Sequence, residues 1–380
     1  MSGVRVPHHP PLPPFLCRSF ALKLRGEGYT MTQTPADAPL GALLTVAPPV
    51  LSPAEAARHL SRHWGMIGAL EALTSERDLN FRLTTDRGRF VVKIANSAEP
   101  VEQTRFQNRA LRHIAERDPA LPVPRVVATR AGADDVALPS GHLMRVISWL
   151  DGTPLHAAPR SPAQARALAV GLAHLGLALQ GFNDPAASHV LQWDIRHAAH
   201  LRRLIPHVTD EGLRALCAAV LDRFDAIAAQ FPDWRWQVVH NDLNPHNVLV
   251  GDDPDTLAGI IDFGDMVRTP LICDLAVACS YQVASQAGGD PLARFVTFAA
   301  AYHGVLPLTE PERAALFDLT AARMVTTVAI ASWRAARHPE NAPYILRNFP
   351  SAQAGLTAFA MLDRATVAQA LHDALPMEAS

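Results

Sequence analysis

The character of the sequence changes around Asp151-Gly152-Thr153-Pro154, and this change limits the possible folds more than any other feature. Before this segment, turn residues separate short apolar runs of strand type, whereas long stretches rich in alanine, leucine and arginine follow it. Strands and helices that are segregated along a chain are typical of α+β folds. We therefore predict an α+β protein with two lobes, a small antiparallel β lobe over residues 48–150 and a mostly helical lobe over residues 151–380.

The predicted N-terminal lobe begins with a helix and contains five strands. The helix is expected from residue 53 to about residue 64, because Ser52 can cap it and Glu55 completes a capping box. A second helix, over residues 101–117, separates the third strand from the fourth. The strand-like segments are residues 68–73, 79–85, 89–95, 123–128 and 142–149.

The predicted C-terminal lobe consists of helices that are interrupted by three short strands. Helices are expected at residues 162–182, 194–205 and 211–231, and again from residue 270 onward. Short apolar strands are expected at residues 237–239, 248–250 and 259–261.

Two polar segments adjoin these short strands. The first is His240-Asn241-Asp242-Leu243-Asn244-Pro245-His246-Asn247, and the second is Asp262-Phe263-Gly264. Phosphoryl transfer from a nucleotide needs a carboxylate that orients the acceptor hydroxyl, oxygen ligands for Mg²⁺ and a cation for the phosphates. The spacing His-x-Asp-x-x-x-x-Asn, followed by Asp-Phe-Gly, is the order in which kinases place these groups.

This order assigns a role to four residues. Asp242 is the candidate catalytic base, and Asn247 and Asp262 are candidate Mg²⁺ ligands, because this ion prefers oxygen donors. Lys93, inside the third strand of the small lobe, is the candidate cation for the donor phosphates. Each segment alone also fits an ordinary surface turn, but the shared order and the strand context favour phosphoryl transfer.

Two further residues are interpreted as structural. His240 lies two residues before the candidate base, so we expect it to brace the loop by hydrogen bonds. Asp274 follows an apolar run and opens a helix, which predicts either an N-cap or a second brace of the catalytic loop.

The composition favours a small-molecule partner over nucleic acid or a membrane. The chain has 34 basic and 36 acidic residues and a formal net charge of -2, which is not the basic surface that nucleic acids require. Its four cysteines form no CxxC pair, so we expect a reducing, cytoplasmic setting. The apolar run at residues 168–179 predicts a buried helix and not a membrane span.

Residues 1–47 differ from the rest of the chain. Residues 6–14 contain five prolines and have neither helical nor strand periodicity. We interpret residues 1–47 as an extension that is either disordered or misassigned, with Met31 as the alternative start.

About residues 50–365 resemble the aminoglycoside phosphotransferase and choline kinase superfamily, whose members have a protein-kinase-like fold. Within that superfamily, the chain is similar to hydroxylysine kinase and to the phosphotransferase domain fused to class III aminotransferases. The similar segments are Lys93-Ile94-Ala95-Asn96, Ser148-Trp149-Leu150-Asp151-Gly152-Thr153-Pro154-Leu155, Trp193-Asp194-Ile195-Arg196 and Ile260-Ile261-Asp262-Phe263-Gly264-Asp265-Met266. The resemblance implies Mg²⁺ and a nucleotide, ATP or GTP, bound between the lobes.

The resemblance also suggests nucleotide-binding residues in the small lobe. The first hairpin loop contains no glycine, so Ser75 and Asn80 are the candidates that replace a glycine-rich loop at the phosphates. Gln107 takes the place of the glutamate that pairs with the lysine in kinases, with Glu102 as an alternative. Ser148 and Leu150 belong to the strand and linker that the resemblance places against the purine.

The acceptor is predicted to be an amino-acid-like amino alcohol. Such a zwitterion needs a carboxylate for its ammonium group and an arginine for its carboxylate. The candidate substrate-binding residues are Asp194 and Asp265, Arg196 and Arg323, and Trp193. The alternatives are an aminoglycoside, choline, ethanolamine or homoserine phosphotransferase, or a catalytically inactive nucleotide-binding module. The acceptor, the choice of ATP or GTP and the oligomeric state stay open.

Overall fold

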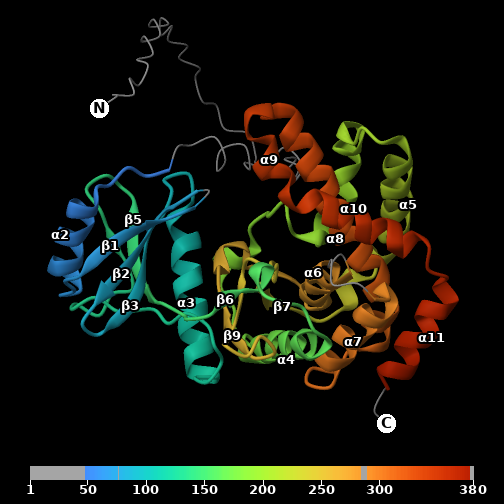
Figure 1. The fold of residues 1–380 in the computed structure, drawn as a ribbon, viewed down its shortest axis with the longest axis horizontal. Helices are drawn as coiled ribbons and strands as arrows, with labels where there is room; N and C mark the ends of the chain where they lie inside the picture. The colour runs from blue at the N-terminus through green and yellow to red at the C-terminus, as the bar shows by residue number, and fades with distance from the viewer. Residues whose placement is uncertain (1–47, 76, 284–288, 377–380) are drawn as a thin grey trace, which may run out of the picture. The chain divides into compact units, whose positions relative to one another are not determined.

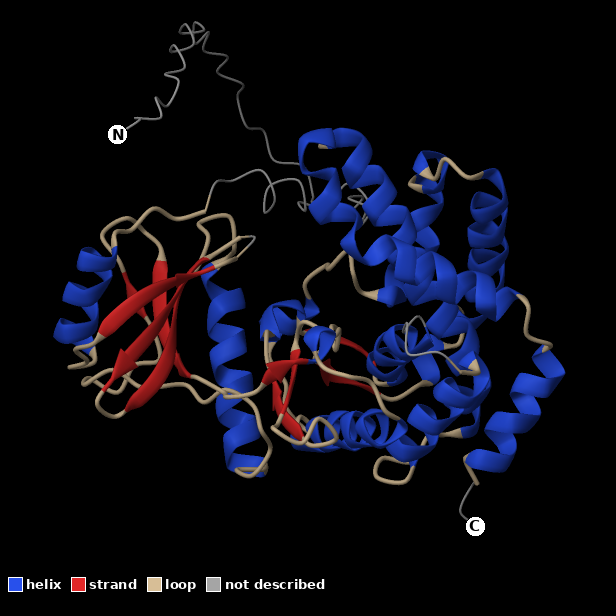
Figure 2. Cartoon of the chain, in the orientation of Figure 1, coloured by secondary structure: helices blue, strands red, loops and turns tan. Residues whose placement is uncertain are grey.

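The computed structural model describes residues 48–75, 77–283 and 289–376. The predicted N-terminal extension, residues 1–47, lies outside the described residues. The described part has a strand-rich lobe and a helical lobe, so the predicted two-lobed α+β fold is confirmed (Figures 1 and 2).

The small lobe is built on a five-stranded antiparallel sheet with the order β1-β2-β3-β5-β4. The strands are β1 Ala69–Leu73, β2 Leu79–Thr85, β3 Gly88–Ile94, β4 Val136–Ala137 and β5 Leu143–Ser148. Because side chains alternate between the faces of a strand, each face of this sheet has its own partner. One face, which includes Phe81, Val92 and Met144, is buried in one cluster with Ala56 and Leu60 of helix α2 (Pro53–His63).

The other face of the sheet carries polar residues. Asn80 of β2 pairs with Lys93 of β3, and Lys93 pairs with Arg145 of β5, so the three lie side by side across the sheet. Arg145 donates a hydrogen bond to Asn108 of helix α3 (Val101–Arg117), which lies alongside this face (Figure 1). The strand register therefore places the candidate lysine within a polar layer between the sheet and α3.

The predicted strand at residues 123–128 is wrong. There, only Val126 forms an isolated bridge, with Ile147, and the fifth strand is the short β4. Pro122 and Pro124 have no amide hydrogen to donate to a ladder, which explains why this apolar segment does not form a regular strand. The capping box of α2 is confirmed, because Ser52 and Glu55 each accept a backbone hydrogen bond from the other residue.

The large lobe is mainly helical, with α8 at its centre (Figure 1). Its helices are α4 Pro162–Ala178, α5 Glu211–Ala228, α6 Ile272–Val283, α7 Pro291–His303, α8 Glu310–Arg337, α9 Ala342–Ile345, α10 Phe349–Ala360 and α11 Arg364–Ala374. Among the described residues, α8 is the one helix long and apolar enough to cross a membrane, and 94% of its apolar window is buried inside the protein. Burial of this kind is typical of a core helix.

The predicted helix at residues 194–205 is present as a 3₁₀ helix, η3, over Ile195–Arg203. The Asp194 side chain caps its first turn by accepting a hydrogen bond from the Arg196 amide. Pro206 follows closely and cannot donate an amide hydrogen, so an α-helix cannot continue through this point.

Two small sheets position the polar segments of the large lobe. Strand β7 (Trp236–Val239) pairs with β10 (Val267–Pro270), and β8 (Val248–Val250) pairs with both β6 (Thr153–Pro154) and β9 (Leu257–Ile260). The predicted strands next to the polar segments are thereby confirmed, with shifts of a few residues at their ends. The loop of residues 240–247 joins β7 to β8, and the loop of residues 261–266 joins β9 to β10.

Candidate active site

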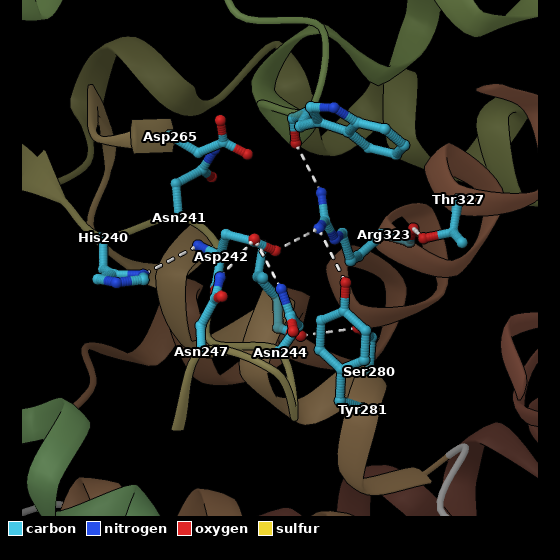
Figure 3. Close-up of polar contacts among 12 residues, drawn as sticks. His240, Asn241, Asp242, Asn244, Asn247, Asp265, Ser280, Tyr281, Arg323 and Thr327 are labelled. Atoms are coloured by element: carbon cyan, nitrogen blue, oxygen red, sulfur yellow. Dashed lines mark hydrogen bonds and ion pairs between the residues drawn. The ribbon is translucent and has the colours of Figure 1, made fainter. Parts of the chain in front are cut away.

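Asp242 lies at the centre of the loop between β7 and β8, and three side chains orient its carboxylate (Figure 3). Oδ1 accepts a hydrogen bond from Nη2 of Arg323 at 3.2 Å. Oδ2 accepts from Nδ2 of Asn244 at 2.7 Å and from Nδ2 of Asn247 at 2.8 Å. Both carboxylate oxygens are therefore held in one orientation, as a residue that aligns a reacting hydroxyl requires.

The surroundings of Asp242 bring its pKa close to neutrality. Burial raises the pKa of Asp242 to about 7, and the nearby carboxylates of Asp265 and Asp262 act in the same direction, while Arg323 opposes them. A general base is most effective when its pKa lies near the working pH. The environment of this carboxylate thus suits proton transfer at neutral pH.

The catalytic loop is held from behind by buried residues. Nδ1 of His240 accepts a hydrogen bond from the Asp242 amide at 3.3 Å, and its Nε2 lies 3.1 Å from the Ile261 carbonyl. These contacts require a neutral ring that donates from Nε2. Asp274 accepts a hydrogen bond from the Asn241 amide at 2.7 Å, and Asn241 has a left-handed backbone with a φ of 64°. His240 and Asp274 thus make the contacts that bracing residues need.

Asp262 opens the second loop, also with a left-handed backbone, at a φ of 61°. Its Oδ1 accepts a hydrogen bond from the Gly264 amide at 3.3 Å. Burial alone would raise the pKa of Asp262, but the positive charges of Lys93 and Arg77 outweigh burial and hold this pKa below its ordinary value. The carboxylate is therefore ionised at neutral pH, as a metal ligand must be.

The residues present fit a Mg²⁺ ion that is completed by other ligands. The described residues contain no group of three or more His, Cys, Asp or Glu residues that holds a metal by itself. However, Mg²⁺ is commonly held by one or two protein carboxylates together with water and substrate phosphates. Because Nδ2 of Asn247 donates to Asp242, its amide oxygen is the atom that suits a cation beside the Asp262 carboxylate.

Lys93 is paired with a residue that the sequence analysis missed. Its Nζ lies 3.8 Å from Oδ2 of Asp78, and the Asn96 amide donates to Oδ1 of Asp78 at 3.2 Å. Gln107 instead donates to Glu99 at 3.0 Å and accepts from Arg145. Asp78 lies just before the start of β2. In the hairpin predicted between β2 and β3, the start of β2 lies beside Lys93, so this strand pairing could have identified Asp78 as the partner of Lys93.

The alternative partner of the lysine, Glu102, is turned elsewhere. Its carboxylate pairs with Arg105 and Arg109 at the surface of α3. Glu102, in the first turn of α3, therefore does not pair with Lys93.

A cavity of about 450 Å³ between the lobes brings these residues together. From the small lobe, the predicted Ser75, Asn80, Lys93 and Gln107 line it. Ser148 and Leu150 do not, because the Ser148 hydroxyl accepts a hydrogen bond from the Arg125 amide at 2.8 Å, and the Leu150 side chain lies against Gly259. Any contact of this linker with a purine is left to its backbone.

Three of the five predicted substrate residues line the cleft, namely Trp193, Asp265 and Arg323. Arg323 is 2% exposed and is already engaged, since Nη2 also donates to the Tyr281 hydroxyl at 3.0 Å and Nη1 donates to the Trp193 carbonyl at 3.0 Å (Figure 3). Its guanidinium lies 5.5 Å from the centre of the Trp193 ring. Arg323 therefore orients Asp242, while its Nε has no hydrogen-bond partner among the described residues, and its predicted role in binding a substrate carboxylate stays a prediction.

The structure does not bring the other two, Asp194 and Arg196, into the cleft. Asp194 is buried, accepts a hydrogen bond from the Thr269 hydroxyl at 2.9 Å and lies 3.2 Å from Nε of Arg196. Arg196 donates to the Arg268 carbonyl at 3.0 Å and lies over the Trp236 ring. These contacts join η3 to β10, so the prediction of substrate binding by this pair is corrected to a structural role.

The cleft also contains residues that the sequence analysis did not single out. Arg77 and Glu99 line it from the small lobe, and Arg334, Tyr344 and Arg347 line it from the large lobe. Arg334 follows Arg323 by eleven positions, which is close to three helical turns, so the spacing along α8 was a usable signal. The positions of Tyr344 and Arg347, in the short helices after α8, had no comparable signal in the sequence.

Comparison with known proteins adds an independent finding. Residues 69–317 match the family described as "Phosphotransferase enzyme family". Hydroxylysine kinase from Mus musculus is 26% identical over 336 residues, which cover 79% of this chain and 87% of that protein. Homoserine kinase from Methylobacillus glycogenes is 31% identical over 239 residues, which cover 62% of this chain and 70% of that protein.

Two solved structures share the fold. Amicoumacin kinase in complex with AMP-PNP, Ca²⁺ and Ami has a TM-score of 0.61 at 14% identity, over 83% of this chain and 97% of that one. A microcompartment-associated aminopropanol kinase has a TM-score of 0.60 at 17% identity, over 80% of this chain and 97% of that one. Because the family match spans more than half of the 380 residues and contains both catalytic loops, this chain belongs to the phosphotransferase enzyme family.

Proposed function

We propose that this protein is a small-molecule kinase that transfers the γ-phosphoryl group of a nucleoside triphosphate to a hydroxyl of an amino-acid-like amino alcohol, as hydroxylysine kinase does. One observation carries the proposal. The Asp242 carboxylate, held by Arg323, Asn244 and Asn247, lines the same cleft as Lys93 and Asp262. A base, a phosphate-binding cation and metal ligands in one cleft are the parts that phosphoryl transfer needs.

The residues of the cleft divide the work of the transfer. Asp242 accepts the proton of the acceptor hydroxyl, while Asn244 and Asn247 keep its carboxylate aligned. Lys93, which Asp78 holds in place, binds the donor phosphates. Asn247 and Asp262 hold the divalent cation, for which Mg²⁺ is the proposed ion. When bound, that ion neutralises charge on the phosphates.

The charges of the acceptor half of the cleft favour a zwitterion over a polycation. Arg334 and Arg347 line the cleft, and Asp265, which pairs with Arg77 at 3.6 Å, is the lining carboxylate that we assign to an ammonium group. The positive charge of Arg347 also contributes, after burial and His156, to the lowered pKa of His246 in the same lining. Arginines suit a carboxylate, whereas an aminoglycoside, which carries several ammonium groups, would be repelled by them.

The names of two relatives agree with this choice, because hydroxylysine and homoserine are amino acids with a side-chain hydroxyl and so carry both an ammonium group and a carboxylate. Aminopropanol, named in a solved structure of the same fold, is an amino alcohol without a carboxylate. The choice between ATP and GTP, the cytoplasmic location and the lack of nucleic-acid or membrane partners stay predictions.

A transfer assay tests the proposal. The protein is incubated with Mg²⁺ and either ATP or GTP, and with 5-hydroxylysine, homoserine, 1-amino-2-propanol, ethanolamine, choline or an aminoglycoside. We expect phosphorylation of an acceptor that carries both an ammonium group and a carboxylate, and a loss of about 10²–10⁴-fold in kcat for Asp242→Asn.

Two controls define what would overturn the proposal. The melting temperature of Asp242→Asn should stay close to that of the wild type, so that a lost rate reports chemistry. Turnover only with aminoglycosides would replace the amino-alcohol assignment. Nucleotide binding without transfer to any acceptor would favour the inactive nucleotide-binding module.

A further inference from the structure

The segment between β1 and β2 contains no glycine. Residues 74–78 are Thr-Ser-Glu-Arg-Asp, and Thr74, Ser75, Arg77 and Asp78 line the cleft. Glycine lets backbone amides approach a phosphate closely, and a loop in which every residue has a side chain loses that advantage. In such a loop, a side chain has to bind the phosphates in place of the backbone amides.

The backbone of Arg77 is fixed next to the lysine that binds the donor. Its carbonyl accepts a hydrogen bond from Nδ2 of Asn96 at 2.9 Å. The next residue, Asp78, accepts from the Asn96 amide at 3.2 Å and pairs with Lys93 at 3.8 Å. Asn96 lies two residues after the end of β3, so Arg77 and Lys93 are both anchored at the same end of that strand.

The Arg77 guanidinium extends across the cleft to the second loop. Its Nη2 lies 3.6 Å from Oδ1 of Asp265 and would lie 3.5 Å from a methyl group placed on Gly264. The distance of 3.6 Å is an ion pair and is too long for a hydrogen bond. Within the part of the chain that the structure describes, this guanidinium has no hydrogen-bond partner, and about a third of its side chain is exposed, at 32%.

The carboxylates around Arg77 outnumber its single charge. Burial acts to lower the pKa of its guanidinium, but Asp265, Asp262, Glu99 and Asp78 together raise this pKa above its ordinary value. A cation bound at Asp262 would take over part of this neutralisation and would repel the guanidinium at short range. The donor phosphates, in contrast, offer paired oxygens that match the planar fork of an arginine.

From this geometry, and resting on the function proposed above, we propose that Arg77 is the phosphate-binding side chain of the first hairpin loop. Against Asp265, where the structure places it, the guanidinium partly neutralises the proposed metal site. When the nucleotide binds, the guanidinium donates to its phosphates beside Lys93. Arg77 thus opposes the binding of a free cation and favours the binding of a nucleotide with its cation.

These two opposite effects make the inference testable by binding alone. Arg77→Ala should weaken the binding of AMP-PNP or its guanosine analogue, with Mg²⁺, by about tenfold or more, because charged hydrogen bonds are lost. The same variant should bind Mn²⁺ several-fold more tightly without nucleotide, since a competing positive charge is gone. Calorimetry measures the first effect, and paramagnetic resonance of free Mn²⁺ measures the second.

Two further variants separate shape from charge. Arg77→Lys should keep the weak Mn²⁺ binding but lose part of the nucleotide affinity, because an ammonium group cannot bind two oxygens as a fork. Arg87→Ala is the matched control, since Arg87 belongs to the next hairpin turn, pairs with Asp86 at 4.0 Å and has a 74% exposed side chain. It should leave both affinities unchanged.

The outcomes distinguish this inference from the proposed function. If the wild type binds neither nucleotide analogue, the proposed function fails and this inference fails with it. If the wild type binds an analogue and Arg77→Ala binds it equally well, only the role of Arg77 is refuted. A variant that weakens Mn²⁺ and the nucleotide together, or that weakens the binding of adenosine, would show general damage to the cleft and would also refute this role.

Discussion

Arg323 should control the pH at which this enzyme becomes active. Asp242 must be ionised to accept a proton, and burial raises its pKa to about 7, so activity should rise as the pH passes through about 7. Arg323 donates to this carboxylate and favours its ionised form. Replacing Arg323 with methionine removes that charge and keeps an unbranched side chain, so the pKa of Asp242 should rise further and the acidic limb of the profile should move to higher pH.

The geometry sets the size of this shift. Nη2 of Arg323 lies 3.2 Å from Oδ1 of Asp242, and the two side chains are 3% and 18% exposed. Unit charges about 4 Å apart interact by about 4 kcal/mol near a protein surface, before the cost of removing both groups from water is subtracted. Measured hydrogen bonds to charged groups contribute about 1.5–3 kcal/mol, and about 1.4 kcal/mol corresponds to one pKa unit. The acidic limb should therefore move up by about one to two pH units.

The measurement is kcat/KM for the acceptor as a function of pH at saturating nucleotide, because this ratio reports the pKa values of the enzyme before the acceptor binds. Arg337→Met is the control, since Arg337 lies in the last turn of the same helix, stacks on Trp333 and does not line the cleft. An Arg323→Met variant that is folded, as judged by its melting temperature, but keeps its acidic limb at the wild-type pH would refute the proposed coupling. A shift to lower pH would refute it as well.

Two further predictions concern residues that shape the site without lining it. Asn241 has a φ of 64° and its side chain makes no hydrogen bond in the described part of the chain, so Asn241→Gly should preserve stability, while Asn241→Ala should unfold more easily than Asn241→Gly by about 1–2 kcal/mol in urea titrations. An equal stability of the two variants would contradict the backbone argument. Asp194→Ala removes a buried partner of Arg196 and should destabilise the fold by about 3 kcal/mol. The KM of Asp194→Ala for the acceptor should stay within about twofold of the wild-type value. A large rise in this KM at unchanged stability would show instead that Asp194 binds the substrate.

The sequence alone predicted the features that depend on neighbouring residues. The capping box at Ser52 and Glu55 and the hairpin between β2 and β3 follow from short-range spacing and turn chemistry, and both are present. The polar segments around Asp242 and Asp262 were also recognisable, because short apolar strands frame each of them. The strand predicted at residues 123–128 is wrong, because prolines interrupt this apolar segment and cannot donate to a strand ladder.

Tertiary structure alone decided which charged residues meet in the cleft. Arg323 contacts Asp242 from 81 positions further along the chain, and only the packing of α8 under the catalytic loop brings the two together. Arg196 resembled Arg323 as a candidate in the sequence, yet it is bound to Asp194 and the Arg268 carbonyl outside the cleft. An arginine side chain is long and flexible, and its partner is set by the position of whole elements, which nearest-neighbour patterns do not encode. The reaction class was therefore readable from the sequence, whereas the roles of its arginines had to come from the fold.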